Sequence, residues 1–144
     1  MRNRTTRNAC SILGSLALSG CAALAPSQAL LPAGAIPFAA PAVYQEWFQR
    51  TEACSGRTGN LGAVQFYVVP GVETFETKDG PQVGVWIGEG DSHRIVIAGN
   101  YQGHEMVVRH ELLHTLLGQT GHPEEYFVSR CRLTWESWNS GHQL

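Results

Sequence analysis

The pattern of hydrophobic residues predicts a helix at the start of the folded region. Over residues 43–54 hydrophobic positions recur three and four residues apart, and Gly56 follows where such a helix would end. Trp47 and Phe48 lie on this pattern, so we expect both side chains in the core.

Three further runs of hydrophobic residues predict strands. They cover residues 64–69, 83–87 and 94–98, and glycine or proline follows each of them. A shorter extended piece is expected over residues 72–77, before a turn at residues 78–81. The predicted sheet therefore has three or four strands.

A second helix is predicted over residues 106–117, and it is apolar around most of its circumference. At about 100° per residue, its polar side carries His110, Glu111 and His114 together with Val107. An irregular C-terminal segment is expected after it. This order of elements predicts an α+β domain, in which a small twisted sheet packs against an N-terminal helix and the histidine-bearing helix.

Residues 110–114 read His-Glu-Leu-Leu-His, the pattern in which two imidazoles hold a zinc ion and the glutamate transfers a proton. Residues four apart on a helix have Cβ atoms about 5–6 Å apart, which suits one metal bound at about 2.0–2.1 Å from each ring. The alternative is a core helix whose histidines bond to their neighbours. The apolar surroundings, and another histidine after a glycine-bounded turn, favour the metal site.

The N-terminal residues predict a targeting segment. Arginines precede an apolar run at residues 9–18, which is too short for a resident transmembrane helix. We therefore expect a signal peptide over residues 1–20. Residues 18–21, Leu-Ser-Gly-Cys, resemble a bacterial lipobox, which implies cleavage before Cys21 and lipid on its thiol and new amino group. Ala22 after this cysteine implies sorting to the outer membrane, facing the periplasm of the cell envelope.

Residues 21–40 are rich in alanine and proline, and we expect a lipid anchor and tether before a domain at residues 41–144. The whole chain has a formal net charge of −2, from 10 basic and 12 acidic residues. Removal of residues 1–20 takes away three arginines and leaves a net charge of −5. A mildly acidic chain without a basic cluster argues against a nucleic-acid partner.

Four cysteines are present, and two remain after the predicted processing. Cys10 is removed with the signal peptide and Cys21 carries lipid, which leaves Cys54 and Cys131. In an oxidising compartment these two most simply form one disulfide. Closing so long a loop would stabilise the domain by about 4 kcal/mol in the chain-entropy model.

A helix, a small sheet and a helix bearing residues 110–114 resemble the N-terminal half of a zincin metallopeptidase domain. The resemblance covers residues 41–122, and its specific part is the five-residue motif. It implies a Zn²⁺ cofactor bound by His110, His114 and a third residue. It also implies that Glu111 is the general base and that the substrate is a peptide or protein.

The third zinc ligand departs from the metzincin pattern. Metzincins place glycine three residues and histidine six residues after the second motif histidine, whereas Gly118 and His122 come four and eight residues after His114. A glycine past the helix end takes the left-handed conformation that reverses the chain, so His122 can return to the metal face.

Other third ligands remain open. Metzincins also have a methionine turn after the motif, and this chain has no methionine after Met106. Gluzincins use a downstream glutamate, for which Glu136 and Glu125 are candidates, and a site without a third protein ligand is a further alternative.

These observations predict a zinc-dependent hydrolase, in particular a small cell-envelope metallopeptidase that activates water with Glu111 as general base. Membrane contact would be made through the lipid on Cys21. Two alternatives are a zinc-binding lipoprotein without catalysis and an envelope scaffold in which the motif only packs the core. The oligomeric state is left open by the sequence.

Overall fold

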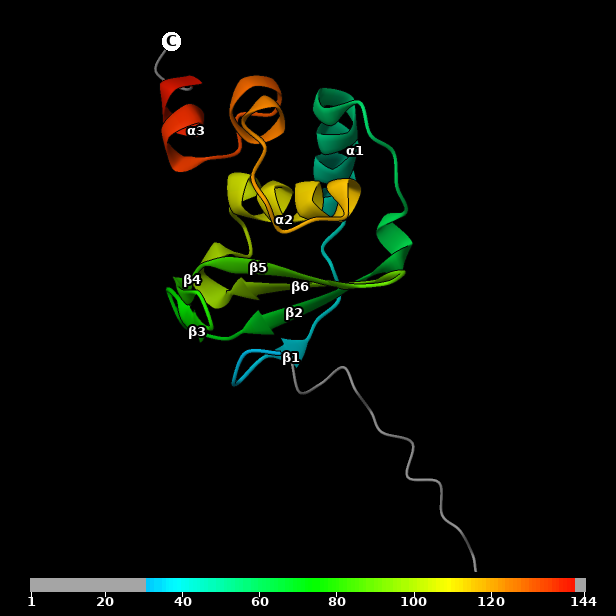
Figure 1. The fold of residues 1–144 in the computed structure, drawn as a ribbon. Coiled ribbons are helices and arrows are strands. Elements are labelled where there is room, and N and C mark those ends of the chain that lie inside the picture. Colours follow the sequence, from blue (N-terminus) through cyan, green and yellow to red (C-terminus); the bar gives the residue numbers. More distant parts are fainter. Residues whose placement is uncertain (1–30, 142–144) are drawn as a thin grey trace, which may run out of the picture.

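The computed structural model describes residues 31–141, whose secondary structure is mixed α and β (Figure 1). The expected α+β class is confirmed. In chain order the elements are β1 (Ile36–Pro37), α1 (Val43–Ser55), η2 (Leu61–Ala63), β2 (Val64–Val69), β3 (Phe75–Thr77), β4 (Gly80–Gln82), β5 (Gly84–Glu89), β6 (Ser92–Ala98), η3 (Gly99–Tyr101), α2 (Glu105–Leu117), η4 (Glu125–Arg130) and α3 (Trp135–Gly141).

The main sheet has four strands in the order β1-β2-β6-β5. Strands β2 and β6 are parallel, while β1 and β5 each pair antiparallel with their neighbour. In this register Ile95 lies opposite both Phe66 and Trp86. Strands β3 and β4 form a separate two-stranded hairpin. Because β5 is at the end of the main sheet, one of its edges has no partner strand within residues 31–141.

The predicted strands at residues 64–69, 83–87 and 94–98 correspond to β2, β5 and β6, and the predicted helices to α1 and α2. Three features differ from the expectation. Strand β4 begins within the predicted turn at residues 78–81 and pairs with β3 outside the main sheet. Strand β1 lies in the segment assigned to the tether and pairs with β2. The C-terminal segment, which we expected to be irregular, forms the π-helix η4 and the helix α3. It is ordered because Phe127 and Leu133 are buried in the core and Cys131 is tied to α1.

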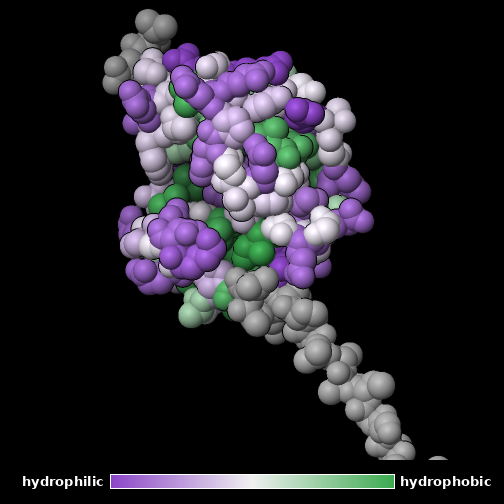
Figure 2. Space-filling view, viewed as in Figure 1, coloured by the Kyte–Doolittle hydropathy of each residue, from purple (hydrophilic) through white to green (hydrophobic). Residues whose placement is uncertain are grey.

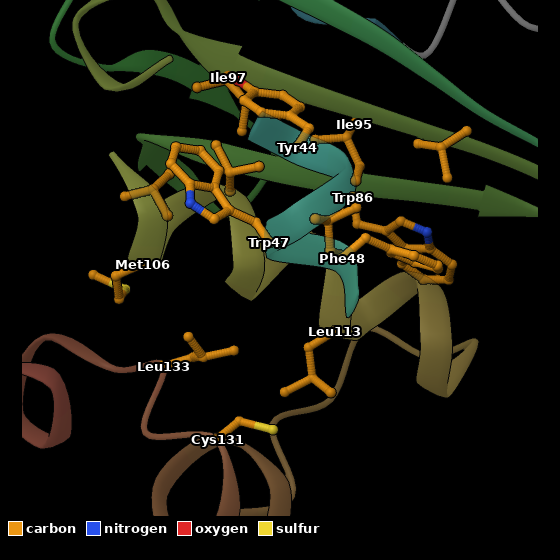
Figure 3. Packing of buried hydrophobic residues seen from close by; sticks show 14 of the residues in the cluster. Tyr44, Trp47, Phe48, Trp86, Ile95, Ile97, Met106, Leu113, Cys131 and Leu133 are labelled. Carbon is orange, nitrogen blue, oxygen red and sulfur yellow. The ribbon is translucent and has the colours of Figure 1, made fainter. Parts of the chain in front are cut away.

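Helices α1 and α2 cover one face of the main sheet, with α3 and η4 above α2 in the view of Figure 1. The core lies between these two layers (Figure 3). Ile95 and Ile97 of the central strand β6 face it, and Leu112 and Leu113 of α2 pack against them with no exposed surface. The main aromatic residues of this core are Tyr44, Trp47 and Phe48 of α1, Phe66 of β2, Trp86 of β5 and Phe127 of η4.

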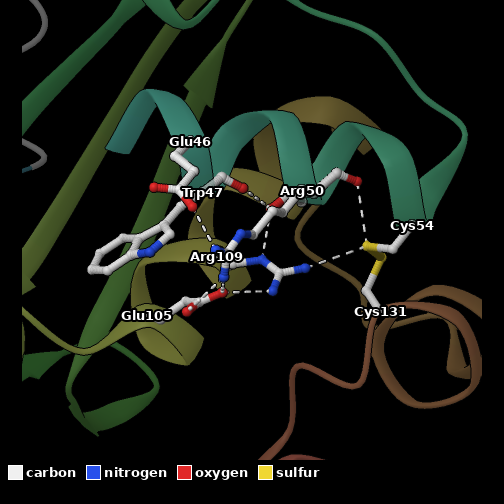
Figure 4. Close-up of polar contacts among 8 residues, drawn as sticks. Glu46, Trp47, Arg50, Cys54, Glu105, Arg109 and Cys131 are labelled. Atoms are coloured by element: carbon white, nitrogen blue, oxygen red, sulfur yellow. Dashed lines mark hydrogen bonds and ion pairs between the residues drawn. A yellow bond between two sulfur atoms is a disulfide. The ribbon is translucent and has the colours of Figure 1, made fainter. Parts of the chain in front are cut away.

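A buried polar cluster joins α1 to α2 (Figure 4). The guanidinium of Arg109 donates from Nε to Thr51 Oγ1 at 3.1 Å and from Nη1 to Glu105 Oε1 at 2.9 Å. Its Nη2 lies 3.7 Å from Cys54 Sγ. Cys54 forms a disulfide with Cys131, across a separation of 77 residues. The cysteine pair expected from the sequence is thus joined, and it links the end of α1 to the end of η4.

The surface of the face shown in Figure 2 is mostly hydrophilic or mixed. Hydrophilic residues cover the β3–β4 hairpin, and hydrophobic residues reach this face in several separate areas. Within residues 31–141 no helix has the length and hydrophobicity needed to cross a bilayer.

Candidate metal centre

Helix α2 carries the three polar side chains of the motif near its middle and end. His110, Glu111 and His114 lie within one turn of one another, as the motif requires. The helix ends at Gly118, which has φ of 65° and donates its N–H to the carbonyl oxygen of His114 at 2.8 Å. This left-handed cap reverses the chain, as expected, and the following loop brings His122 back over α2.

The Nε2 atoms of the three histidines converge on one point. The distances are 3.0 Å between His110 and His122, 3.2 Å between His114 and His122, and 3.3 Å between His110 and His114. These are the side chains within residues 31–141 whose ligand atoms gather as in a metal site. The three rings therefore form a triad, which we call the histidine triad.

Hydrogen bonds fix which nitrogen of each helix histidine is free. His110 Nδ1 lies 2.7 Å from the carbonyl oxygen of Leu133, and His114 Nδ1 lies 2.8 Å from that of Gln119. A carbonyl oxygen has no proton, so each Nδ1 must be the donor and each neutral ring has its lone pair on Nε2. The two lone pairs face each other, which is unfavourable unless a cation lies between them.

This cation is not expected to be a proton, because burial disfavours protonation of the histidines. Desolvation lowers the pKa of His110 and of His114 to about 4, and it also lowers the pKa of His122. All three imidazoles are thus neutral near pH 7 and available as metal ligands.

The triad fits zinc in size and donor type. Two nitrogens bound at about 2.0–2.1 Å with a tetrahedral angle would be separated by about 3.3–3.4 Å. The three observed separations reach or fall slightly below this value. Three imidazoles leave one position of a tetrahedron open, the arrangement of catalytic zinc sites. The hydrogen bonds to the Leu133 and Gln119 carbonyls are of the kind that orient metal-bound histidines.

Glu111 lies beside the triad on the side facing β5. Its residue exposure is 5%, and its carboxylate accepts a hydrogen bond from the backbone N–H of Trp86. Burial raises the pKa of this carboxyl group to about 8, and the hydrogen bond from Trp86 lowers it by a smaller amount. Gly84 faces the carboxylate so closely that a β-carbon there would lie 2.8 Å from Oε1. Absence of a side chain at position 84 therefore makes room for Glu111.

Two aromatic residues contact the triad. The indole of Trp86 is nearly parallel to the His114 ring, at an angle of 17° and a centroid distance of 6.1 Å. The ring of Phe127 lies 4.8 Å from each of the three imidazole centroids. Neither residue was predicted from the sequence as part of the site, and no role was predicted for Gly84.

Two open cavities flank the centre. One has a volume of about 280 Å³ and extends from the triad along β5 to Thr77 and Asp79 of the hairpin. The other has a volume of about 320 Å³ and extends to Met106, Leu133 and Trp135. Both cavities are lined by His110, Glu111 and His122, so a groove passes across the candidate metal centre.

The other residues considered from the sequence lie elsewhere. Glu125 is in η4 and pairs with Arg130 at 3.3 Å, and Glu136 is in the first turn of α3. Neither belongs to the group of converging ligand atoms formed by the triad. Cys21 lies outside the described residues.

Comparisons with models of protein families, with curated proteins and with solved structures find no match. The function has to be inferred from the site itself.

Proposed function

We propose that this protein is a zinc-dependent hydrolase, a small metallopeptidase of the bacterial cell envelope with a zincin-like active site. One observation carries the proposal: three neutral imidazole nitrogens converge at 3.0–3.3 Å, with two of the rings held by carbonyl groups. Core packing alone gives no reason for lone pairs to face each other, whereas a bound dication turns this repulsion into coordination.

In this proposal His110, His114 and His122 hold the metal, and Glu111 is the general base. Zinc, when bound, supplies a Lewis acid for the scissile carbonyl and lowers the pKa of water toward about 7. Glu111 takes a proton from the attacking water and passes it to the leaving amine. A dication near the carboxyl group favours its ionised form, which offsets the effect of burial on its pKa.

A peptide substrate is supported by the unpaired edge of β5. In an antiparallel pair, alternate residues turn their backbone groups toward the partner strand. Because the carbonyl of Val83 accepts from the N–H of Ala98, the backbone groups of Gly84 and Trp86 face the open edge. The Trp86 N–H is used by Glu111. The remaining groups border the groove, where an extended peptide could pair with them.

The proposed location is the outer membrane, facing the periplasm, with the protein anchored by lipid on Cys21. The lipobox-like residues 18–21 support this part of the proposal. The disulfide between Cys54 and Cys131 fits an oxidising compartment.

Metal content and turnover of matched variants test the function. Wild-type protein should contain one zinc per chain and cleave unfolded protein substrates. Glu111→Gln should keep zinc and fold but lose about 10²–10⁴-fold in rate, because only proton transfer is removed. His110→Gln should lose zinc and melt earlier, because metal binding is linked to folding. Equal turnover by Glu111→Gln and wild type, with zinc in place, would instead indicate a zinc-binding lipoprotein without catalysis.

The third ligand has its own test. His122→Ala should lower zinc occupancy, whereas Glu125→Ala and Glu136→Ala should leave it unchanged. Loss of zinc in Glu136→Ala together with full occupancy in His122→Ala would show a different ligand set. Absence of stoichiometric zinc from all the proteins, wild type included, would favour the envelope scaffold.

A further inference from the structure

Phe127 lies under the histidine triad and contacts all three of its rings. Its side chain is fully buried, and the centroid of its ring is 4.8 Å from each imidazole centroid. The angles between ring planes range from 42° to 79° among the imidazoles themselves and from 44° to 64° between Phe127 and the imidazoles. The three imidazole rings, which come from two different segments, thus all pack against the ring of Phe127.

The backbone of Phe127 is also connected to the triad. Its N–H donates to the carbonyl oxygen of Pro123 at 3.1 Å, and Pro123 directly follows His122. Its carbonyl oxygen accepts from the N–H of Leu133 at 2.7 Å. The carbonyl of Leu133 in turn orients His110. The position of Phe127 in η4 therefore determines both the loop that carries His122 and the acceptor that fixes His110.

His122 depends most on this contact. His110 and His114 are held by carbonyl groups at Nδ1, but within residues 31–141 the close polar contacts of the His122 ring are those of its Nε2 with the other two rings. His122 is also an exposed residue. Without a partner at Nδ1, the orientation of its ring is set by packing, and Phe127 is the aromatic surface against which it packs.

We propose that Phe127 is the positioning residue of the metal centre and keeps the three imidazoles, His122 above all, in the orientation that binds the ion. This inference rests on the proposed metal site. Side chains held in their binding orientation before the ion arrives lose less entropy on binding. The apolar ring also excludes water from behind the site, and the shell around a metal controls solvent access and dielectric.

Substitution by a residue of different shape tests the role. Phe127→Leu should weaken zinc binding by at least tenfold, within the 10–100-fold range typical of residues that orient metal ligands. The Co²⁺-substituted protein should show a changed visible spectrum, because the coordination geometry of the ion changes. Phe127→Met has a flexible side chain that fills irregular gaps, and it covers the case in which the leucine variant does not fold. It should show the same effects, because it also lacks the flat ring against which the imidazoles pack.

Phe66→Leu is the matched control. Phe66 is 6% exposed in the same core, and its ring contacts are with Phe38 and Tyr44 rather than with the triad. Both Phe→Leu variants should lose stability, but Phe66→Leu should keep the zinc affinity and Co²⁺ spectrum of wild type. The proposal is overturned if the Phe127 variants also keep both. Failure of wild type itself to bind zinc or Co²⁺ with one ion per chain would reject the proposed metal site instead.

Discussion

Gly84 of β5 and Glu111 of α2 touch across the junction between the sheet and the helical layer. A β-carbon at position 84 would lie 2.8 Å from Oε1 of Glu111 and 3.1 Å from its Cγ. The same strand holds the carboxylate through the N–H of Trp86. The position of the proposed base is thus set by β5, which also borders the groove across the candidate metal centre.

Gly84→Ala should therefore displace the Glu111 carboxylate and lower the rate of peptide cleavage. We expect at least a tenfold decrease, since removal of a general base costs about 10²–10⁴-fold. Zinc content should stay at one per chain, because the triad is not touched. Gly103→Ala is the control, since a β-carbon there meets no atom within 4 Å and should leave the rate unchanged. Equal kcat values for Gly84→Ala and wild type would argue against this role of the contact.

The sequence predicted the parts of the site that depend on local spacing. The 3.6-residue period of α2 places His110 and His114 on one side of the helix, and Gly118 ends it in the left-handed conformation. The return of His122 follows from that cap and the short loop after it. These features depend on residues at most eight positions from His114.

The remaining parts depend on contacts between distant segments. Gly84 is 27 residues from Glu111 in the sequence, and only the packing of β5 on α2 brings them together. Phe127 lies in a π-helix, which is a rare element. Its sequence has no hydrophobic period by which it could be told apart from an irregular segment. Strand β1 is two residues long and contains Pro37, so its pairing with β2 left no strand pattern in the sequence.

Cys21→Ser should release the protein from the membrane or leave its signal peptide uncleaved. The reason is chemical, because serine lacks the thiol to which the first lipid would be attached. Fractionation and gel mobility of the variant in the native host measure the outcome. Unchanged membrane association and mobility would mean that residues 18–21 are not a lipobox.

The zinc-free protein should be most stable near pH 6.5. Burial lowers the pKa of His110 and His114 from 6.5 to about 4. Between pH 6.5 and pH 4 these histidines therefore bind protons in the unfolded state but not in the folded state. Stability then falls as the pH is lowered from 6.5 to 4. Glu111 acts oppositely: its pKa rises from 4.5 to about 8 on folding, so its contribution is lost as the pH rises through 8. Below pH 6.5 the two histidines change the stability more than Glu111 does, so their effect sets the direction. Above pH 6.5 Glu111 is the one of these three groups that still changes the stability.

Urea unfolding in the presence of a chelator, from pH 4 to pH 9, measures this profile. Glu111→Gln should remove the decline above pH 6.5 and keep the decline below it. A stability that rises between pH 6.5 and pH 8 in wild type, or the same alkaline decline in Glu111→Gln, would contradict the assignment.

Reduction of the Cys54–Cys131 disulfide should weaken both the fold and the metal centre. The loop that it closes spans 77 residues, so its loss should lower the free energy of unfolding by about 4 kcal/mol in the chain-entropy model. Cys131 directly follows η4 and lies two residues before Leu133, whose carbonyl orients His110. Release of this segment from α1 frees Phe127 and Leu133 to move, and zinc should bind less tightly.

Unfolding by urea and zinc competition with a chelator, each with and without a phosphine reductant, measure the two effects. The double variant Cys54→Ser/Cys131→Ser is the control, because it should resemble the reduced wild type and not respond to the reductant. Weaker stability with unchanged zinc affinity would mean that η4 keeps its position without the disulfide. Identical unfolding of reduced and oxidised wild type would show that the disulfide contributes nothing to the fold.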